Sequence, residues 1–129
     1  ALIAGWGEEE ALKRAEAFIA AGADAIMIHS KEKSSDEVLS FLAKYSEFET
    51  KVPVIAVPTT YNTITEAELV DAGADVVIYA NHLLRAAYPA MLAVAETILA
   101  DGRSKGVDDV LLPVKEIITL IDVHTATGN

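Results

Sequence analysis

Four polar side chains stand at places where this chain could do chemistry: His29, Ser30, Asn81 and His82. The first two directly follow one short apolar run, and the last two follow another. Imidazole, hydroxyl and amide groups all form hydrogen bonds with ligands, and imidazole also changes charge near neutral pH. His29 could instead be a satisfied structural histidine, and Asn81 could cap the next helix. How these four side chains are arranged in space depends on the secondary structure that the two apolar runs adopt.

The two apolar runs, at residues 25–28 and 76–80, are too short to favour helices and fit parallel strands that are buried on both faces. Each follows a Gly-Ala-Asp sequence, which begins at Gly22 and again 51 residues later at Gly73. In parallel α/β folds the functional groups lie just beyond the carboxyl ends of the strands. The repeat therefore predicts both the architecture and the edge of the sheet where the polar side chains gather.

Apolar periodicity extends this pattern to four strand–helix units and a final helix. The expected strands cover residues 1–4, 25–28, 52–57 and 76–80. The expected helices cover residues 8–21, a segment from the S-x-x-E sequence at residues 34–37 to Tyr45, and residues 65–72, 83–100 and 110–122. The first helix is expected to bury the stripe Ala11, Leu12, Ala15, Phe18 and Ile19. Residues 123–129 are expected to form a tail in which His124 is inert.

A second polar loop, residues 58–63, follows the expected strand at residues 52–57. It contains Thr59 and Thr60, whose hydroxyl groups could face a ligand. Threonines in loops also serve turns and caps, and the T-x-x-E sequence at residues 65–68 predicts a capping box of that kind. Both interpretations of Thr59 and Thr60 stay open.

The charge of the chain argues against nucleic acid as a partner. The 129 residues carry a formal net charge of −10, whereas a nucleic-acid binder needs basic residues to displace counterions. A small anionic substrate needs only local donors and stays possible. The chain contains no cysteine, and neither a signal peptide nor a membrane span is expected, so a cytoplasmic location is expected.

The segment at residues 83–100 is unusually apolar for a helix of a small domain. No charged residue occurs between Ala86 and Ala95, and Pro89 is expected to kink or break the helix. A helix that is apolar most of the way round is buried on more than one side. We therefore expect a second subunit to cover it.

Five sequence motifs in this chain resemble one known family. They are IAGWGEEEALKRA at residues 3–15, AGADAIMIHSK at 21–31, VPTTY at 57–61, YANHLLRAA at 79–87 and LPVKEI at 112–117. Together they are similar to the phosphoenolpyruvate mutase and phosphonopyruvate hydrolase branch of the isocitrate lyase superfamily, from Ala1 to about Leu120. The resemblance implies a (β/α)8 barrel that binds Mg²⁺, of which residues 1–122 would be units five to eight, the carboxyl-terminal half.

The resemblance also implies an activity and a set of site residues. A phosphoenolpyruvate mutase is an isomerase that interconverts phosphoenolpyruvate and phosphonopyruvate, forming a carbon–phosphorus bond for phosphonate biosynthesis. His29 matches a family histidine that touches substrate and is the expected catalytic residue; Thr59, Asn81 and His82 are expected substrate-binding candidates beside it. No metal ligand is expected among these residues, because the family's Mg²⁺-positioning Asp and Glu, its substrate-binding Arg and its lid precede the part matched by this chain. The family also exchanges its eighth helix between subunits, which implies a homo-oligomer with helix exchange around residues 83–100.

Several alternatives stay open from the sequence. The chain begins inside an apolar run without Met, so it was either cleaved at Ala1 or is part of a longer polypeptide, and we expect the second. Such a piece is expected to be inactive alone. The reaction could also be that of phosphonopyruvate hydrolase or of another C–C or C–P lyase of the superfamily. Finally, the chain could be a non-catalytic α/β assembly module, or, with less support, an independent flavodoxin-like domain, whose open strand edges would favour aggregation.

Overall fold

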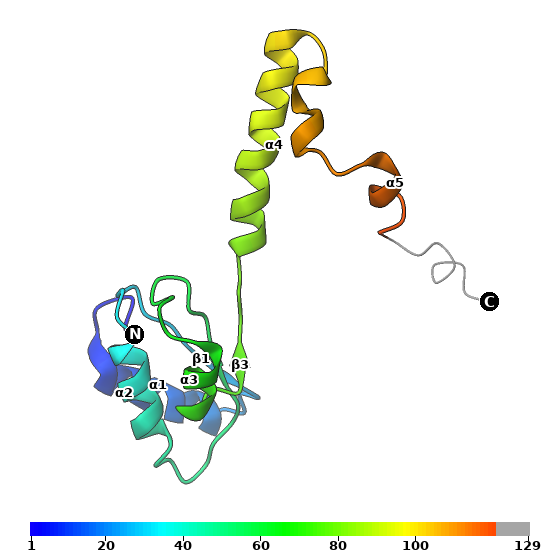
Figure 1. Cartoon of the computed structure of the whole chain (residues 1–129). Helices are drawn as coiled ribbons and strands as arrows, with labels where there is room; N and C mark the ends of the chain where they lie inside the picture. Colours follow the sequence, from blue (N-terminus) through cyan, green and yellow to red (C-terminus); the bar gives the residue numbers. More distant parts are fainter. Residues whose placement is uncertain (121–129) are drawn as a thin grey trace, which may run out of the picture. The chain divides into compact units, whose positions relative to one another are not determined.

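A computed structural model describes residues 1–120, which belong to two compact units divided between Asn81 and His82. Helices and strands alternate in the first unit (Figure 1). In chain order they are α1 (Gly7–Ala20), β1 (Ile26–Ile28), α2 (Asp36–Tyr45), β2 (Val54–Ala56), α3 (Glu66–Asp71) and β3 (Val76–Val77). The second unit contains α4 (His82–Asp101), the 3₁₀ helix η1 (Lys105–Val110) and α5 (Val114–Ile117).

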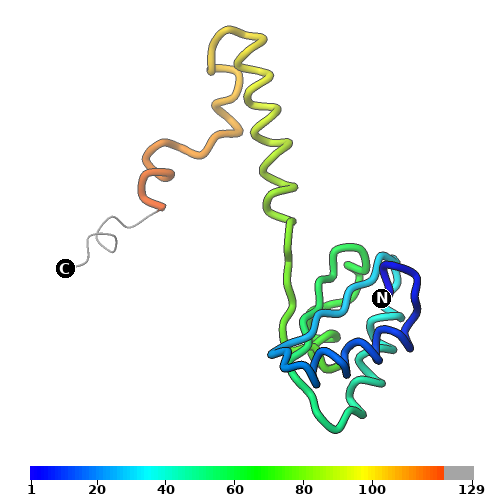
Figure 2. Tube along the Cα trace, turned by 180° about the vertical axis from the view of Figure 1, so that it is seen from behind, coloured from blue at the N-terminus to red at the C-terminus, as the bar shows by residue number. Residues whose placement is uncertain are grey.

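The three strands form a parallel sheet in the order β1-β2-β3, as the repeat predicts. α1 packs against both α2 and β1, and α3 packs against β3. Figure 2 shows from behind how the chain returns through a helix between one strand and the next. The core beneath the sheet contains Ile26, Ile28, Val54, Ala56 and Phe41. The sheet therefore directs the carboxyl ends of its three strands to one edge, where the candidate side chains follow.

One row of apolar side chains crosses the other face of the sheet without cover in this unit. Met27 pairs with Ile55, and Ile55 pairs with Val76, so the three lie side by side in register. Met27 is 57% exposed and Val76 is 44% exposed. The expectation that both faces of these strands are buried is therefore wrong within the first unit. A parallel sheet with one apolar face open is the arrangement of a barrel wall whose interior is not closed.

The first predicted strand, residues 1–4, is a turn. The backbone N–H groups of Ala4 and Trp6 both donate to the carbonyl oxygen of Ala1, and that of Gly5 donates to Leu2. These hydrogen bonds close the chain on itself and remove the groups that a strand ladder would need. The apolar run serves the core instead, because Leu2 is buried there.

The two Gly-Ala-Asp repeats end their helices in the same way. Gly22 has φ +95° and Gly73 has φ +105°, which is the left-handed conformation that glycine adopts without strain. In each repeat, the N–H of the following alanine donates to a carbonyl in the last turn of the helix, at 3.0 and 2.9 Å, to complete a Schellman motif. The Asp75 carboxylate then accepts a hydrogen bond from the N–H of Val54 at 2.8 Å, which fixes β3 against β2.

One of the two predicted capping boxes forms. Thr65 caps α3, with its hydroxyl accepting from the Glu68 N–H while the Glu68 carboxylate accepts from the Thr65 N–H. The box predicted for Ser34 and Glu37 is wrong, because α2 begins after Ser35 and the Glu37 carboxylate instead accepts a hydrogen bond from the hydroxyl of Ser30. A partner seven residues away in the chain thus replaces the local one.

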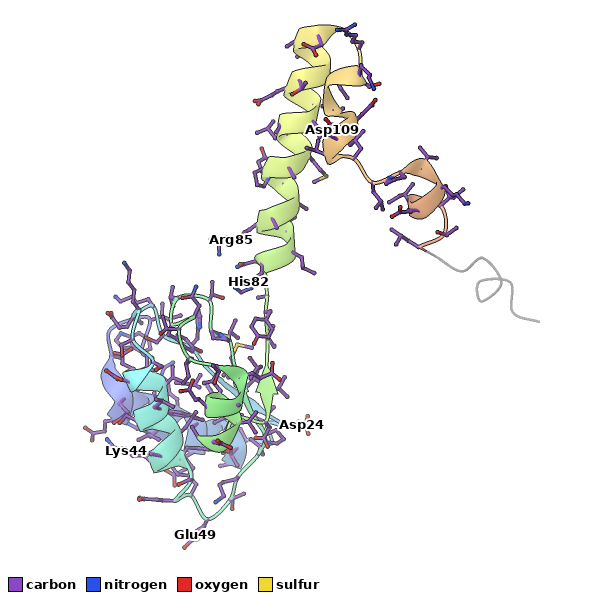
Figure 3. The ribbon with its side chains drawn as sticks, viewed as in Figure 1. Asp24, Lys44, Glu49, His82, Arg85 and Asp109 are labelled. Atoms are coloured by element: carbon purple, nitrogen blue, oxygen red, sulfur yellow. The ribbon has the colours of Figure 1, made fainter. Side chains whose placement is uncertain are left out.

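α1 and α2 are joined by an ion pair that makes stability depend on pH. The Lys44 ammonium group, on the surface of α2 (Figure 3), donates to the Glu8 carboxylate in the first turn of α1. The hydrogen bonds from Lys44 and Ser40 lower the pKa of Glu8. Because the folded-state pKa of this acid is lowered, its stabilisation is present above the unfolded-state pKa and is lost as the pH falls through the folded-state value.

We expect Lys44→Ala to lower the free energy of unfolding at pH 7 by less than about 1 kcal/mol, because the pair is partly exposed. At an acidic pH below the folded-state pKa of Glu8, where the carboxylate is protonated, the difference from wild type should shrink towards zero. Urea unfolding at the two pH values measures this, with the exposed Lys33→Ala as the matched control. A deficit of equal size at both pH values would show that Lys44 acts through packing and not through its charge.

α4 runs without a break through Pro89, so of the two expected outcomes, a kink or a break, the break does not occur. Proline removes the hydrogen bond to the carbonyl of Arg85, four residues earlier, and Arg85 is exposed, so water can satisfy that group. The last helix, predicted for residues 110–122, forms only in part among the described residues: η1 ends at Val110, and α5 begins directly after Pro113 and ends at Ile117. Asp122, His124 and the tail at residues 123–129 lie outside the described residues.

The second unit exposes most of its apolar side chains. η1 packs along α4 and buries Val107, but no residue of α4 itself is buried; its most exposed apolar side chains are Leu83, Leu84 and Leu99. By length and composition alone, α4 could cross a membrane. The expectation that no run approaches a membrane span is therefore wrong for α4, although one such helix is weak evidence for a membrane. Helix exchange around residues 83–100 stays a prediction.

Candidate functional site

The loops after β1 and β2 meet at the carboxyl edge of the sheet. Ser30, two residues beyond β1, is fully buried. Its carbonyl oxygen accepts a hydrogen bond from the hydroxyl of Thr60 at 2.8 Å, and its own hydroxyl donates to Glu37 and accepts from the N–H of Glu32 at 3.0 Å. Three hydrogen bonds therefore fix the backbone immediately after His29.

His29 lies between this fixed serine and the last residue of β1. Its ring faces that of Tyr61, with 6.3 Å between the ring centroids and 53° between the planes. The Nδ1 atom of His29 is buried and has no hydrogen-bond partner within residues 1–120. Buried polar atoms are rarely left unpaired in folded proteins, and each exception needs an explanation, such as a water, an ion, a ligand or another partner that completes the structure. His29 is thus the best candidate for a ligand contact in the first unit.

Tyr61 forms the wall against which His29 lies. Its side chain is fully buried, and its hydroxyl accepts a hydrogen bond from the N–H of Val57 at 3.2 Å. Burial raises the pKa of the Tyr61 phenol, because the charged phenolate would lose its hydration, and the hydrogen bond from Val57 offsets part of that effect. The phenol therefore stays neutral, and Tyr61 holds the loop without acting as an acid or base near pH 7.

Of the other candidates, Thr59 and Asn81 belong to the first unit and His82 belongs to the second. Thr59 is partly exposed, and its N–H donates to the carbonyl of Val57 at 2.8 Å, which tightens the loop after β2. Asn81 is the last residue of the first unit, and its side-chain oxygen is buried without a hydrogen-bond partner among residues 1–120, so that oxygen does not cap α4. His82 is the first residue of α4 in the second unit (Figure 3). The structure brings Thr60 to Ser30 and His29 to Tyr61; substrate contact by His29, Thr59, Asn81 and His82 stays a prediction.

The side chains at this edge do not fit a Mg²⁺ site. Mg²⁺ prefers carboxylate and other oxygen ligands in octahedral geometry. Within residues 1–120, no three His, Asp or Glu side chains converge on one point. The Glu37 carboxylate, which is nearest along this network, is engaged by Ser30. A hydrogen-bonding edge with one imidazole can contact an anion, but the described residues supply no metal-binding set.

The sequence predicted that His29 follows a strand, but it did not show which contacts hold this residue. Ser30, Thr60 and Tyr61 were visible as polar residues after strands, yet their partners are up to 30 residues away in the chain. One feature of the sequence did point to these contacts: both loops directly follow strands that were predicted to be parallel neighbours. That placement predicts that the loops approach each other, although it does not identify which groups bond.

Comparison with known proteins identifies relatives along nearly the whole chain. The family model described as phosphoenolpyruvate phosphomutase matches residues 1–99. The chain is 46% identical over 121 residues to a phosphonopyruvate hydrolase of Variovorax sp., covering 93% of this chain and 41% of that protein. It is 44% identical over 120 residues to a phosphoenolpyruvate phosphomutase of Tetrahymena pyriformis, covering 93% and 39%. The chain thus spans about two fifths of the length of these relatives.

Solved structures give the same result for the fold. A phosphoenolpyruvate phosphomutase from Streptomyces platensis subsp. rosaceus matches with a TM-score of 0.82 and 50% identity, over 92% of this chain and 40% of that one. A phosphonopyruvate hydrolase in complex with oxalate and Mg²⁺ matches with a TM-score of 0.78 and 46% identity, over 92% and 41%.

These matches confirm the expected fold, a partial (β/α)8 barrel, although the described part of the chain forms three strands where four were predicted. They also explain the uncovered row of Met27, Ile55 and Val76, because the interior face of a barrel strand needs the rest of the barrel to cover it. The match of the family model over residues 1–99, together with these relatives, shows that the chain belongs to the phosphoenolpyruvate phosphomutase family.

Proposed function

We propose that residues 1–122 supply the carboxyl-terminal units of a barrel that interconverts phosphoenolpyruvate and phosphonopyruvate. The observation that carries this proposal is His29, whose buried Nδ1 has no partner within residues 1–120 and which lies just beyond the carboxyl end of β1. Catalytic groups of such barrels occupy this edge. The mutase reaction is proposed first because the family model that matches residues 1–99 is described as phosphoenolpyruvate phosphomutase.

In this proposal His29 contacts the anionic substrate. Phosphoryl transfer depends on positioning and on stabilisation of developing charge more than on covalent chemistry by the protein. An imidazole N–H that donates to a phosphoryl or carboxylate oxygen does both. Thr59, Asn81 and His82 are proposed as further substrate contacts. The Mg²⁺ of the family is proposed to bind to carboxylates outside this chain, because residues 1–120 offer no suitable cluster.

Phosphonopyruvate hydrolase is the second candidate, because a hydrolase is as similar to this chain as a mutase is. The chain is 46% identical to the Variovorax hydrolase and 44% identical to the Tetrahymena mutase, so identity does not separate the two reactions. In the hydrolase reaction, water attacks phosphorus and the carbon–phosphorus bond breaks, giving phosphate and the enolate of pyruvate. The methylene carbon of that enolate then takes up a proton and becomes the methyl group of pyruvate. A non-catalytic assembly module is the third candidate, supported only by the lack of an acidic cluster within residues 1–120.

The decisive test joins the amino-terminal part of the Streptomyces platensis barrel to this chain in place of its own carboxyl-terminal part. Phosphorus NMR then follows phosphonopyruvate in the presence of Mg²⁺. We expect the phosphoenolpyruvate signal to appear with the chimaera and no reaction with the 129-residue chain alone. Pyruvate and free phosphate would instead identify a hydrolase. No reaction by a folded chimaera, beside an active intact Streptomyces enzyme, would contradict both catalytic proposals.

Two further properties are proposed for the complete protein. The exposed apolar side chains of α4, among them Leu83, Leu84 and Leu99, are proposed to contact a second subunit. Such a face would be costly to leave in water. The protein is proposed to act in the cytoplasm on a small keto-acid or phosphonate substrate, without nucleic acid as a partner.

A further inference from the structure

We infer that Thr60 is a positioning residue for His29, acting across the two loops at the carboxyl edge of the sheet. The inference rests on the proposed role of His29 in substrate contact. Thr60 belongs to the loop after β2, whereas His29 follows β1. The link between them is the hydrogen bond from the Thr60 hydroxyl to the carbonyl oxygen of Ser30, at 2.8 Å.

Side chains replace the backbone ladder where β1 and β2 end. The last paired residues are Ile28 and Ala56. Beyond them, the Val57 N–H donates to the Tyr61 hydroxyl at 3.2 Å, and the Ser30 carbonyl accepts from Thr60. One short loop, residues 57–61, therefore provides the side-chain partners of both backbone groups: Tyr61 within the loop itself and Thr60 across to the loop after β1. The strands can separate there to open the edge without leaving these two backbone groups unpaired.

His29 is held on three sides by this arrangement. Ile28 before it is paired in the sheet, and Ser30 after it is buried and bonded to Thr60. Its ring lies against Tyr61, whose hydroxyl is bonded to Val57. The Thr60–Ser30 bond ties the backbone beside His29 to the loop that carries Tyr61. Removing that bond should let the imidazole move relative to its wall while β1, β2 and the core stay in place.

The direct test uses the 129-residue chain, so it does not require activity. We expect NMR to show a nuclear Overhauser effect between the rings of His29 and Tyr61 in the wild type. Thr60→Val keeps the shape of the side chain but removes the hydroxyl, and it should abolish most of this effect. Thr60→Ser restores the hydroxyl and should restore the effect. Thr63→Val, at an exposed threonine of the same loop, is the matched control and should leave it unchanged.

A second readout applies to the chimaeric barrel. Thr60→Val should lower kcat by roughly 10- to 100-fold, as for a misplaced catalytic group, while Thr60→Ser stays near the wild-type rate. Thermal unfolding of each variant checks that the fold is retained. Should Thr60→Val unfold, Tyr61→Phe removes the second hydrogen bond of the same loop and should likewise weaken the ring contact.

The outcomes separate this inference from the proposed function. Loss of the ring contact in Thr60→Val supports positioning even if the chimaera is inactive, in which case the proposed function fails alone. An unchanged ring contact in Thr60→Val overturns the inference even if the chimaera is fully active. Equal loss in Thr60→Ser and Thr60→Val would overturn it as well, because the hydroxyl would then not be the cause.

Discussion

His29→Ala in the chimaeric barrel is expected to lower kcat/KM for phosphonopyruvate by about 100-fold or more, the usual effect of removing one donor to a developing negative charge. The reason is the placement of the imidazole beyond the carboxyl end of β1, with Nδ1 buried and unpaired within residues 1–120. Steady-state kinetics measures the effect. His29→Gln should retain part of the activity, because an amide can still donate a hydrogen bond.

Asn62→Ala serves as the control for this prediction, because Asn62 is exposed in the neighbouring loop. It should change kcat/KM little. A His29→Ala chimaera that works as well as the unsubstituted one would show that His29 is a structural histidine, the alternative that the sequence left open.

Phe41→Ala is expected to destabilise the first unit by about 3–5 kcal/mol, because it removes a large side chain from a close-packed core. Phe41 is 2% exposed, and its ring stacks on that of Tyr45 with 5.9 Å between centroids and 8° between planes. A loss of this size is a large share of the stability of a domain of this length, which is commonly about 5–15 kcal/mol. Urea unfolding followed by circular dichroism measures it.

Phe18→Ala provides a control with the same chemistry in the same unit. Phe18 is 55% exposed, so its truncation should change the free energy of unfolding by no more than about 0.5 kcal/mol. A similar decrease in the free energy of unfolding for Phe41→Ala and Phe18→Ala would contradict the burial of Phe41 in the core.

Short-range patterns in the sequence predicted most of the framework. Gly22 and Gly73 end their helices in the left-handed conformation because a helix stop of this kind involves only neighbouring residues. The capping box at Thr65 and the parallel strands around residues 26–28, 54–56 and 76–77 follow from equally local signals. The position of His29 beyond a strand end was predictable for the same reason.

Long-range contacts account for what the sequence could not show. Phe18 has the helical spacing of a buried residue but is exposed, because burial of α1 depends on where α2 and β1 pack and not on spacing alone. Glu37 leaves its predicted cap for Ser30, and Thr60 crosses to the neighbouring loop. Residues 1–4 have the apolar composition of a strand but form a turn, which local hydrogen bonds close. The turn contributes Leu2 to the core.

Calorimetric titration with oxalate and Mg²⁺ tests the central claim most directly: that this chain completes the keto-acid site of a mutase-type barrel. A phosphonopyruvate hydrolase related to this chain was solved with both of these ligands. We expect the chimaeric barrel to bind one oxalate per subunit in the presence of Mg²⁺, and His29→Ala to weaken that binding clearly. A folded chimaera that binds no oxalate would contradict the claim, as would binding that His29→Ala leaves unchanged.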